Sequence, residues 1–189
     1  QLEKAIETEL KDLNFAEVQF QIHFDKLADY TADGVDDVEF LISMNPGQSV
    51  KPLAEVASGG ELSRTMLAIK TVMADRDEIE TLIFDEIDVG ISGRTAQKVS
   101  EKMAVIGKNH QVICITHLAQ IAAQADQHYL IEKTVDGGVT RTEIRKLSEE
   151  ESIDELARIL GGAEITETVR MSAREMKSMV KSNIVKNKK

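Results

Sequence analysis

The chain of 189 residues is poor in cysteine, proline and aromatic residues, with one cysteine, two prolines, no tryptophan and 4% aromatic residues. A lone cysteine cannot form an internal disulfide, so we expect a cytoplasmic setting and a buried thiol for Cys114, which lies in the apolar run VICIT. No apolar stretch reaches the roughly 20 residues of a membrane-spanning helix, and no signal peptide is recognisable. Because the first residue is Gln1 rather than methionine, we expect a fragment of a longer protein.

The chain also lacks a positive net charge. It carries 23 lysine and arginine residues against 33 aspartate and glutamate residues, a net charge of −10, whereas compact nucleic-acid-binding domains are usually basic. Basic side chains do gather in the segment 174–189, as Arg174, Lys177, Lys181, Lys186, Lys188 and Lys189. This pattern is typical of a solvated helix end with a frayed tail, and a contact with a phosphate backbone is the alternative.

Apolar periodicity predicts an α/β protein. Helical spacing favours helices over 1–13, 60–75, 92–107, 118–124, 150–160 and 165–181. Extended patterns favour strands over 15–24, 38–44, 81–85 and 111–116, with a turn at 32–34 between the first two. The alternation of strands and helices after residue 60 implies a parallel sheet. Asp136-Gly137-Gly138 then indicates a β-hairpin.

Each predicted helix has one apolar face, which we expect to be buried. The faces of the two central helices comprise Leu62, Met66, Ile69 and Met73, and then Ala96, Val99, Met103 and Ile106. Those of the last two comprise Ile153, Leu156 and Leu160, and then Val169, Ala173, Met176 and Val180. The segment 1–13 is either a short core-facing helix or the end of a coiled coil.

The most informative segment is TLIFDEIDVG, residues 81–90. A short apolar strand ends here in two adjacent carboxylates, Asp85 and Glu86, and Asp88 follows two residues later. In open α/β sheets the chemistry lies just beyond the carboxyl ends of the strands. Successive side chains of an extended segment point in opposite directions. Asp85 and Glu86 therefore suit a metal-phosphate site, one binding Mg²⁺ and the other a water.

A glycine turn and a histidine belong to the same constellation. Ser58-Gly59-Gly60-Glu61 opens the helix 60–75, and its unpaired N–H groups suit a phosphate oxygen, although an ordinary N-cap is the common alternative. His117 follows the strand 111–116. Because adjacent parallel strands end at the same edge of a sheet, we expect His117 near Asp85 and Glu86.

Taken together, SGGELSR, TLIFDE, DVGISG and the strand ending in His117 resemble the C-terminal lobe of ABC-type ATPase heads. They would be the signature motif, Walker B, the D-loop and the H-loop, in the family order. Glu61 stands where transporters usually have glutamine, and in this respect the chain is similar to the SMC-like ATPases with coiled-coil insertions. Within that subgroup, VASGGELSRTMLAIK, LIFDEIDVGISGRTAQKV and HQVICITHLAQIAAQAD resemble bacterial members that act in DNA double-strand-break repair.

The resemblance implies a role for each matched residue. Asp85 would hold Mg²⁺, Glu86 would activate the attacking water, and His117 would contact the γ-phosphate. The signature residues Ser58, Gly59, Gly60 and Glu61 would face ATP bound on a second head. Asp88 would lie at that dimer interface.

The resemblance also implies partners, because the chain has no G-x-x-x-x-G-K-[ST] phosphate loop. That loop would belong to an N-terminal lobe of the same protein, separated by a coiled coil whose returning end is 1–13, with 14–189 as the C-terminal lobe. We therefore expect ATP and Mg²⁺ to bind only with that lobe present, and the isolated chain to be inactive. DNA would be bound by the full-length protein in the cytoplasm, at the nucleoid.

Two alternatives remain open at this stage. One is the nucleotide-binding subunit of an ABC transporter, which Glu61 and the N-terminal helix disfavour. The other is a non-catalytic dimerisation scaffold with an ABC-like fold, which the presence of both Glu86 and His117 disfavours.

Overall fold

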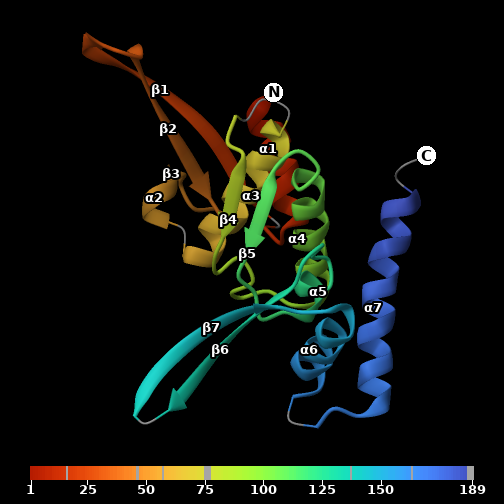
Figure 1. The fold of residues 1–189 in the computed structure, drawn as a ribbon. Coiled ribbons are helices and arrows are strands. Elements are labelled where there is room, and N and C mark those ends of the chain that lie inside the picture. Colours follow the sequence, from red (N-terminus) through yellow and green to blue (C-terminus); the bar gives the residue numbers. More distant parts are fainter. Residues whose placement is uncertain are drawn as a thin grey trace. The chain divides into compact units, whose positions relative to one another are not determined.

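The computed structural model describes the whole chain except residues 16, 46, 57, 75–77, 137, 163 and 187–189, with the backbone alone at 56, 136 and 180–186. The chain divides into two compact units, Gln1–Thr116 and His117–Lys189 (Figure 1). None of the helices in the described part has the length and apolar character needed to span a bilayer.

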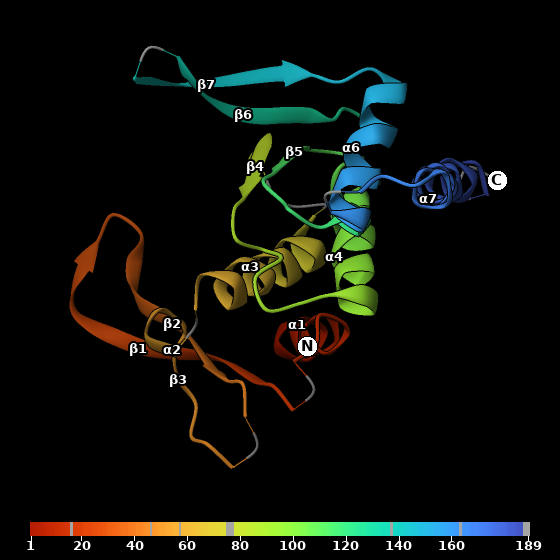
Figure 2. The ribbon, with the colours of Figure 1, turned by 90° about the horizontal axis from the view of Figure 1, so that it is seen from below.

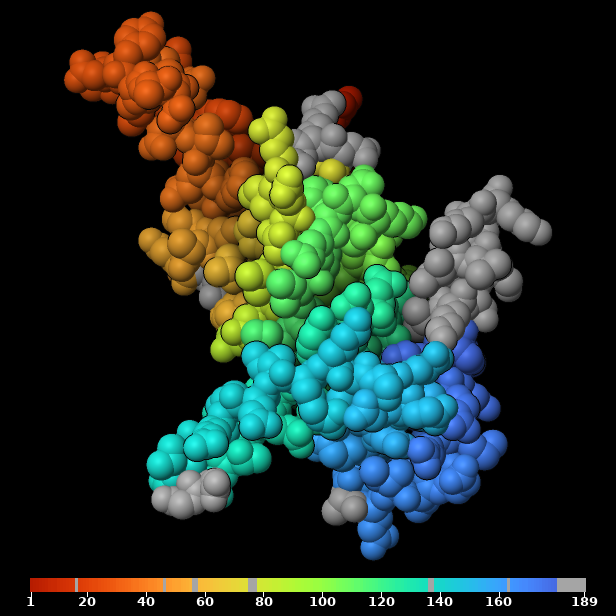
Figure 3. Space-filling model, in the orientation of Figure 1, coloured from red at the N-terminus to blue at the C-terminus, as the bar shows by residue number. Residues whose placement is uncertain are grey.

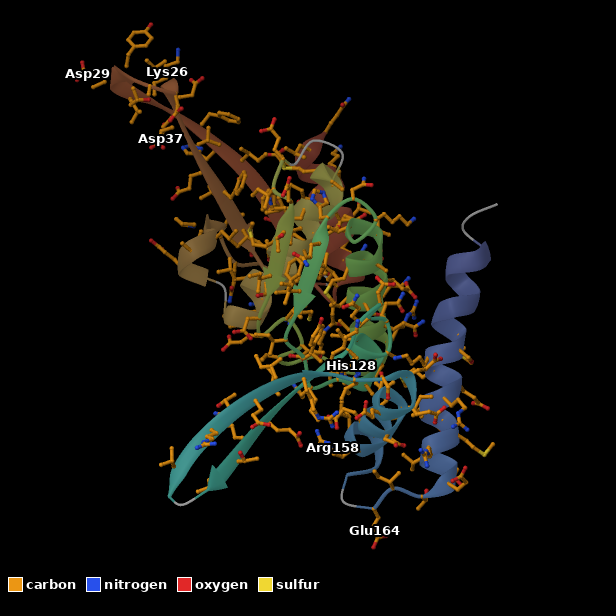
Figure 4. All side chains as sticks on the ribbon, viewed as in Figure 1. Lys26, Asp29, Asp37, His128, Arg158 and Glu164 are labelled. Atoms are coloured by element: carbon orange, nitrogen blue, oxygen red, sulfur yellow. The ribbon has the colours of Figure 1, made fainter. Side chains whose placement is uncertain are left out.

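The first unit opens with a helix and a long β-ribbon. Helix α1 (Leu2–Asp12) precedes β1 (Gln19–Thr31), β2 (Gly34–Ser43), the short β3 (Lys51–Pro52) and α2 (Leu53–Val56), and the three strands form an antiparallel sheet in that order. The base of the ribbon is buried at Phe20 and Ile42. Its far end projects from the unit and carries Lys26 and acidic side chains (Figures 3 and 4). Both strands extend further toward the predicted turn than the sequence indicated.

Helix α1 is anchored in this unit. Ile6 and Leu10 are buried, and α1 packs against helix α3 (Gly59–Met73). The carboxylates of Glu7 and Glu3 accept hydrogen bonds from the backbone N–H groups of Phe20 (2.9 Å) and Ile22 (2.8 Å) in β1. Helix α1 therefore faces the core of this unit, while its role as the end of a returning coiled coil stays a prediction.

Two parallel strands form the centre of the first unit. Strand β4 (Thr81–Phe84) pairs with β5 (Gln111–Cys114), and α4 (Gly93–Ile106) connects them. Helices α1, α3 and α4 lie on one side of the pair (Figure 2), where Leu82 and Phe84 are buried. On the opposite face Ile83 is 67% exposed and Ile113 44%. The predicted parallel α/β arrangement is confirmed, with helices on a single face.

The predicted burial of α4 is confirmed, and that of α3 is wrong in part. All four apolar positions predicted for α4 are buried. In α3, only Ile69 of the predicted face is buried, and Leu62, Met66 and Met73 are between 37% and 39% exposed. Helix α3 instead buries Arg64, Thr65, Leu67 and Ala68. It is apolar on two sides, and the side that the periodicity selected is the uncovered one.

The second unit combines a hairpin with three helices. After α5 (Ala119–Ala122), strands β6 (Tyr129–Asp136) and β7 (Val139–Lys146) pair as the predicted hairpin, and α6 (Glu149–Gly161) and α7 (Glu167–Lys186) follow. Its core comprises Ala119, Ala122, Ala123, Ile153, Leu156, Ala157 and Ala173. Gly162, with φ of 69°, ends α6 as expected of a helix-terminating glycine. The predicted burial of Leu160 is wrong, because it is 39% exposed.

Candidate active site

The loop that follows β4 presents two carboxylates and buries a third. Asp85 and Glu86 are exposed, whereas Asp88 is only 3% exposed. The Glu86 N–H donates to Asp85 Oδ1 (2.9 Å), and the Thr116 hydroxyl donates to Asp88 Oδ2 (2.5 Å). Asp88 therefore ties the loop to the segment after β5, a contact that the sequence did not indicate.

Glu86 has an unusual backbone conformation. Its φ of 56° lies in the left-handed region, which costs a non-glycine residue roughly 1–2 kcal/mol. Ile87 beside it is fully buried and fixes the loop to the unit. Strained backbone of this kind persists only where the surroundings determine it, and it is concentrated at functional sites.

The glycine turn at the start of α3 is closed by Glu61. The Ser58 N–H and the Ser58 hydroxyl both donate to Glu61 Oε2, at 2.9 and 2.7 Å. These hydrogen bonds, the backbone one first, lower the pKa of the Glu61 carboxyl. Ser58 and Gly59 are exposed. The first turn of α3 thus keeps uncovered backbone at a helix N-terminus, where an anion is favoured.

The glycine turn and the carboxylate loop are in contact within the first unit. A Cβ atom on Gly59 would lie 2.0 Å from Glu86 Oε2, and one on Gly60 would lie 3.0 Å from the carbonyl oxygens of Glu86 and Val89. A side chain at position 59 would therefore displace the Glu86 carboxylate, and one at position 60 would press on the loop backbone. The structure therefore brings together the predicted residues 58–61 and 85–86.

Two adjacent side chains of α3, which the sequence does not mark as site residues, hold the carboxylate loop. The Ser63 hydroxyl donates to the carbonyl of Asp85 (2.7 Å), and Arg64 Nη1 donates to the carbonyls of Ile87 (3.1 Å) and Val89 (2.8 Å). Arg64 is 7% exposed, and its guanidinium lies 5.5 Å from the ring centroid of Phe15. Arg64 shares the buried face of α3 with Leu67 and Ala68, and a charged side chain gives no local sequence signal that it is buried there.

The remaining predicted site residue, His117, opens the second unit, and it is exposed. It directly follows Thr116, whose hydroxyl contacts Asp88. Its proximity to Asp85 and Glu86 stays a prediction. No group of three or more histidine, cysteine, aspartate or glutamate residues within the described ranges is arranged to hold a metal by itself.

Cys114, at the end of β5, is half-buried and free. Burial, and then the negative charges of Asp88 and Asp85, raise the pKa of its thiol to about 12. The thiol is therefore protonated at neutral pH and is a weak nucleophile.

No profile of a known protein family matches the chain. Individual relatives do match: it is 44% identical over 186 residues to the DNA repair protein RecN of Halalkalibacterium halodurans, covering 96% of this chain and 33% of that protein. It is 51% identical over 143 residues to the RecN protein of Treponema pallidum, covering 76% and 25%. The chain belongs to the RecN family. It spans about a third of the length of the first RecN relative and corresponds to a C-terminal part.

Solved structures agree with the fold expected of this RecN segment. The Smc head domain of Pyrococcus yayanosii matches with a TM-score of 0.57 and 24% identity, covering 82% of this chain and 28% of that one. The Smc head domain of Pyrococcus furiosus matches with a TM-score of 0.54 and 23% identity, covering 84% and 37%. The predicted α/β fold, that of the C-terminal lobe of an ABC-type head, is confirmed.

Proposed function

We propose that this chain is the C-terminal half of an ATP-hydrolysing head in a coiled-coil protein of DNA double-strand-break repair. The observation that carries the proposal is the contact between the glycine turn at Gly59 and the exposed carboxylate of Glu86. A phosphate-binding helix start and two carboxylates at a strand end are the parts that phosphoryl transfer requires for positioning and charge stabilisation. RecN relatives are named as DNA repair proteins.

The roles follow from the chemistry of each group. Asp85 would hold Mg²⁺, which needs only one or two protein carboxylates because it keeps waters and phosphate oxygens as its other ligands. Bound Mg²⁺ would neutralise charge on the β- and γ-phosphates. Glu86 would orient or deprotonate the attacking water, and His117 would contact the γ-phosphate.

A second head would bring its nucleotide to the glycine turn. Ser58, Gly59 and Gly60 would then contact the γ-phosphate, with Glu61 holding the turn in shape through Ser58. Asp88 would act at that dimer interface by fixing the loop from within, since its carboxylate is buried against Thr116, while the adjacent Val89 is exposed.

The uncovered face of β4 and β5 supports a partner lobe. Parallel sheets normally have both faces covered, yet Ile83, Ile113 and Ile115 are exposed on this face. Beside them Leu62 and Met66 of α3, with Leu82 and Phe84, line a groove of about 280 Å³. An N-terminal lobe of the same protein, carrying the phosphate loop that this chain lacks, is the partner we propose.

The test is reconstitution. We expect no ATP turnover by this chain alone, and turnover when a separately produced N-terminal lobe is added. Glu86→Gln should keep ATP binding by the mixture and lower hydrolysis by about 100-fold or more, because general-base catalysis contributes 10²–10⁴-fold. Turnover by the isolated chain that Glu86→Gln abolishes would contradict the proposal. A mixture that binds ATP and never hydrolyses it would favour the dimerisation scaffold.

DNA contact by the basic tail is a separate part of the proposal. Lys188 and Lys189 lie outside the described residues, so the support is the charge of 174–189 alone. Alanine at both positions should reduce the salt dependence of DNA binding by the full-length protein if the tail neutralises phosphates. An unchanged slope would reject the contact.

A further inference from the structure

The carboxylate loop is held by a regular set of hydrogen bonds from α3. The carbonyl oxygens of Asp85, Ile87 and Val89, every second residue of the loop, accept from the side chains of Ser63 and Arg64. The two donors are adjacent in sequence. This pattern fixes the backbone on both sides of Glu86, whose φ is 56°.

Stability alone gives a poor account of the arginine. Arg64 is buried, and its Nε has no hydrogen-bond partner within the described residues. A buried charge with an unsatisfied donor is costly, and an apolar residue of similar volume is often neutral or stabilising in its place. The arginine side chain is long enough for Nη1 to donate to two carbonyls of the carboxylate loop. It does so from a helix that begins at the glycine turn.

We propose that Arg64 is a positioning residue for ATP hydrolysis: with Ser63, it holds the carboxylate of Glu86 in its working position and links it to the signature turn. The role rests on the proposed function and deepens it. The turn at 58–60 and the donors at 63 and 64 lie within the first two turns of one helix. A displacement of this helix start on contact with the second nucleotide would therefore move the loop that carries Glu86.

This role makes a specific kinetic prediction. Arg64 lies beneath the loop and would touch neither nucleotide nor water, so its substitution should lower kcat and leave the KM for ATP within about threefold. Lysine ends one atom earlier than arginine and cannot keep both carbonyl contacts. Because a misplacement of about 1 Å can cost 10²-fold, we expect Arg64→Lys to lower kcat by about 10- to 100-fold.

The experiment uses the full-length protein that contains this chain. The variants are Arg64→Lys, Arg64→Gln and Ser63→Ala, each also combined with Glu86→Gln, with kcat, KM and the melting temperature measured for all. If Arg64 acts through Glu86, then Arg64→Lys in the Glu86→Gln background should change the single-turnover rate by less than about twofold, because the effects of residues that act as a unit are not additive.

A matched control separates positioning from stability. Lys102 is also a largely buried cation of the first unit, and it pairs with Glu9 and Asp12 of α1. Lys102→Met should lower the melting temperature without a comparable loss of kcat. If Arg64→Lys keeps the wild-type kcat, or if kcat falls only in proportion to melting temperature as in Lys102→Met, the role is overturned. Should Arg64→Gln fail to fold, Arg64→Lys decides. A wild-type protein without ATPase activity would instead refute the proposed function.

Discussion

The chain uses the same four-residue cap at the start of two helices, one in each unit. Ser58 and Glu61 cap α3, and Ser148 and Glu151 cap α6, in each case with the serine N–H donating to the glutamate carboxylate. The serine hydroxyls differ, because that of Ser58 donates to Glu61 Oε2 whereas that of Ser148 accepts from the Glu151 N–H. Only the first of these caps lies at the candidate site, so the cap by itself does not decide what a helix start does.

The difference lies in the two residues between serine and glutamate. At α3 they are glycines, which allow contact with the carboxylate loop. At α6 they are Glu149 and Glu150, and Glu150 pairs with Arg170 and Arg174 of α7. Three carboxylates in its first turn satisfy the positive end of α6 and repel an external anion. One cap leaves its backbone available to a phosphate, and the other holds two helices together.

The largest effect is expected when a side chain replaces a glycine of the first cap, because the second cap has side chains at the same positions. Gly60→Ala places a Cβ 3.0 Å from the carbonyls of Glu86 and Val89. We expect a loss of about 1–3 kcal/mol from overpacking, offset in part by the helix propensity of alanine. Because the loop must shift, ATP hydrolysis by the full-length protein should fall by about 100-fold.

The matched variant is Glu150→Ala at the same position of α6. It removes exposed ion pairs with Arg170 and Arg174, which are worth about 0–1 kcal/mol, and hydrolysis should be unchanged. Equal hydrolysis rates for the two variants would show that the glycine contact has no catalytic role.

A smaller effect is expected from removing the serine of each cap. Ser58→Ala and Ser148→Ala should each cost about 1 kcal/mol of stability, measured by urea unfolding. Only Ser58→Ala should also weaken ATP-dependent association of heads, because its hydroxyl lies at the turn proposed to contact the second nucleotide. If both serine variants associate normally, Ser58 is a structural cap alone.

The sequence predicted the residues of the candidate site more fully than it predicted which faces of the helices are buried. The carboxylates after β4 and the glycine turn were both recognised as parts of one site, because each chemistry needs particular residues at a fixed spacing. Burial was predicted well for α4, where all four apolar positions are covered. Periodicity identifies apolar faces, and for α4 the covering helices are in the chain.

The wrong predictions of burial have one physical cause: a local sequence pattern does not show which part of the chain packs against a given face of a helix. For α3, the face with Leu62 and Met66 is uncovered while Arg64 is buried. Arg64 takes its role from carbonyls more than 20 positions away, and such contacts leave no local pattern. The position of His117 relative to Glu86 is a question of the same kind.

The surroundings of the α6 cap predict a modest pH effect. His128 Nδ1 lies 2.9 Å from Ser152 Oγ in α6, which also accepts from Lys177 (2.5 Å). Burial, and then Lys177, lower the pKa of His128 below 6.5, against the opposing charge of Glu155. As the pH falls below about 6.5, His128 therefore takes up a proton more readily in the unfolded chain than in the folded one, and this favours unfolding. We expect the melting temperature to fall as the pH drops below about 6.5, and His128→Gln to flatten that fall. An identical pH dependence in the variant would contradict this account.

The smallest expected effect is the acid titration of the two caps. In α6 the pKa of Glu151 is lowered from 4.5 to about 2, first by the hydrogen bond from the Ser148 backbone and then by the Ser148 hydroxyl and Arg145. In α3 the pKa of Glu61 is also lowered, first by the hydrogen bond from the Ser58 backbone. Folded pKa values below the unfolded ones mean that this stabilisation is present above about pH 4.5 and is lost as pH falls toward each folded value. Glu151→Gln should therefore destabilise the chain at pH 7 and have less effect near pH 2. Both carboxylates are largely solvated, so the effects should be small and weakened by salt. If Glu61→Gln shows the same pH and salt profile as Glu151→Gln, the two caps are electrostatically equivalent, and their functional difference lies in the glycines alone.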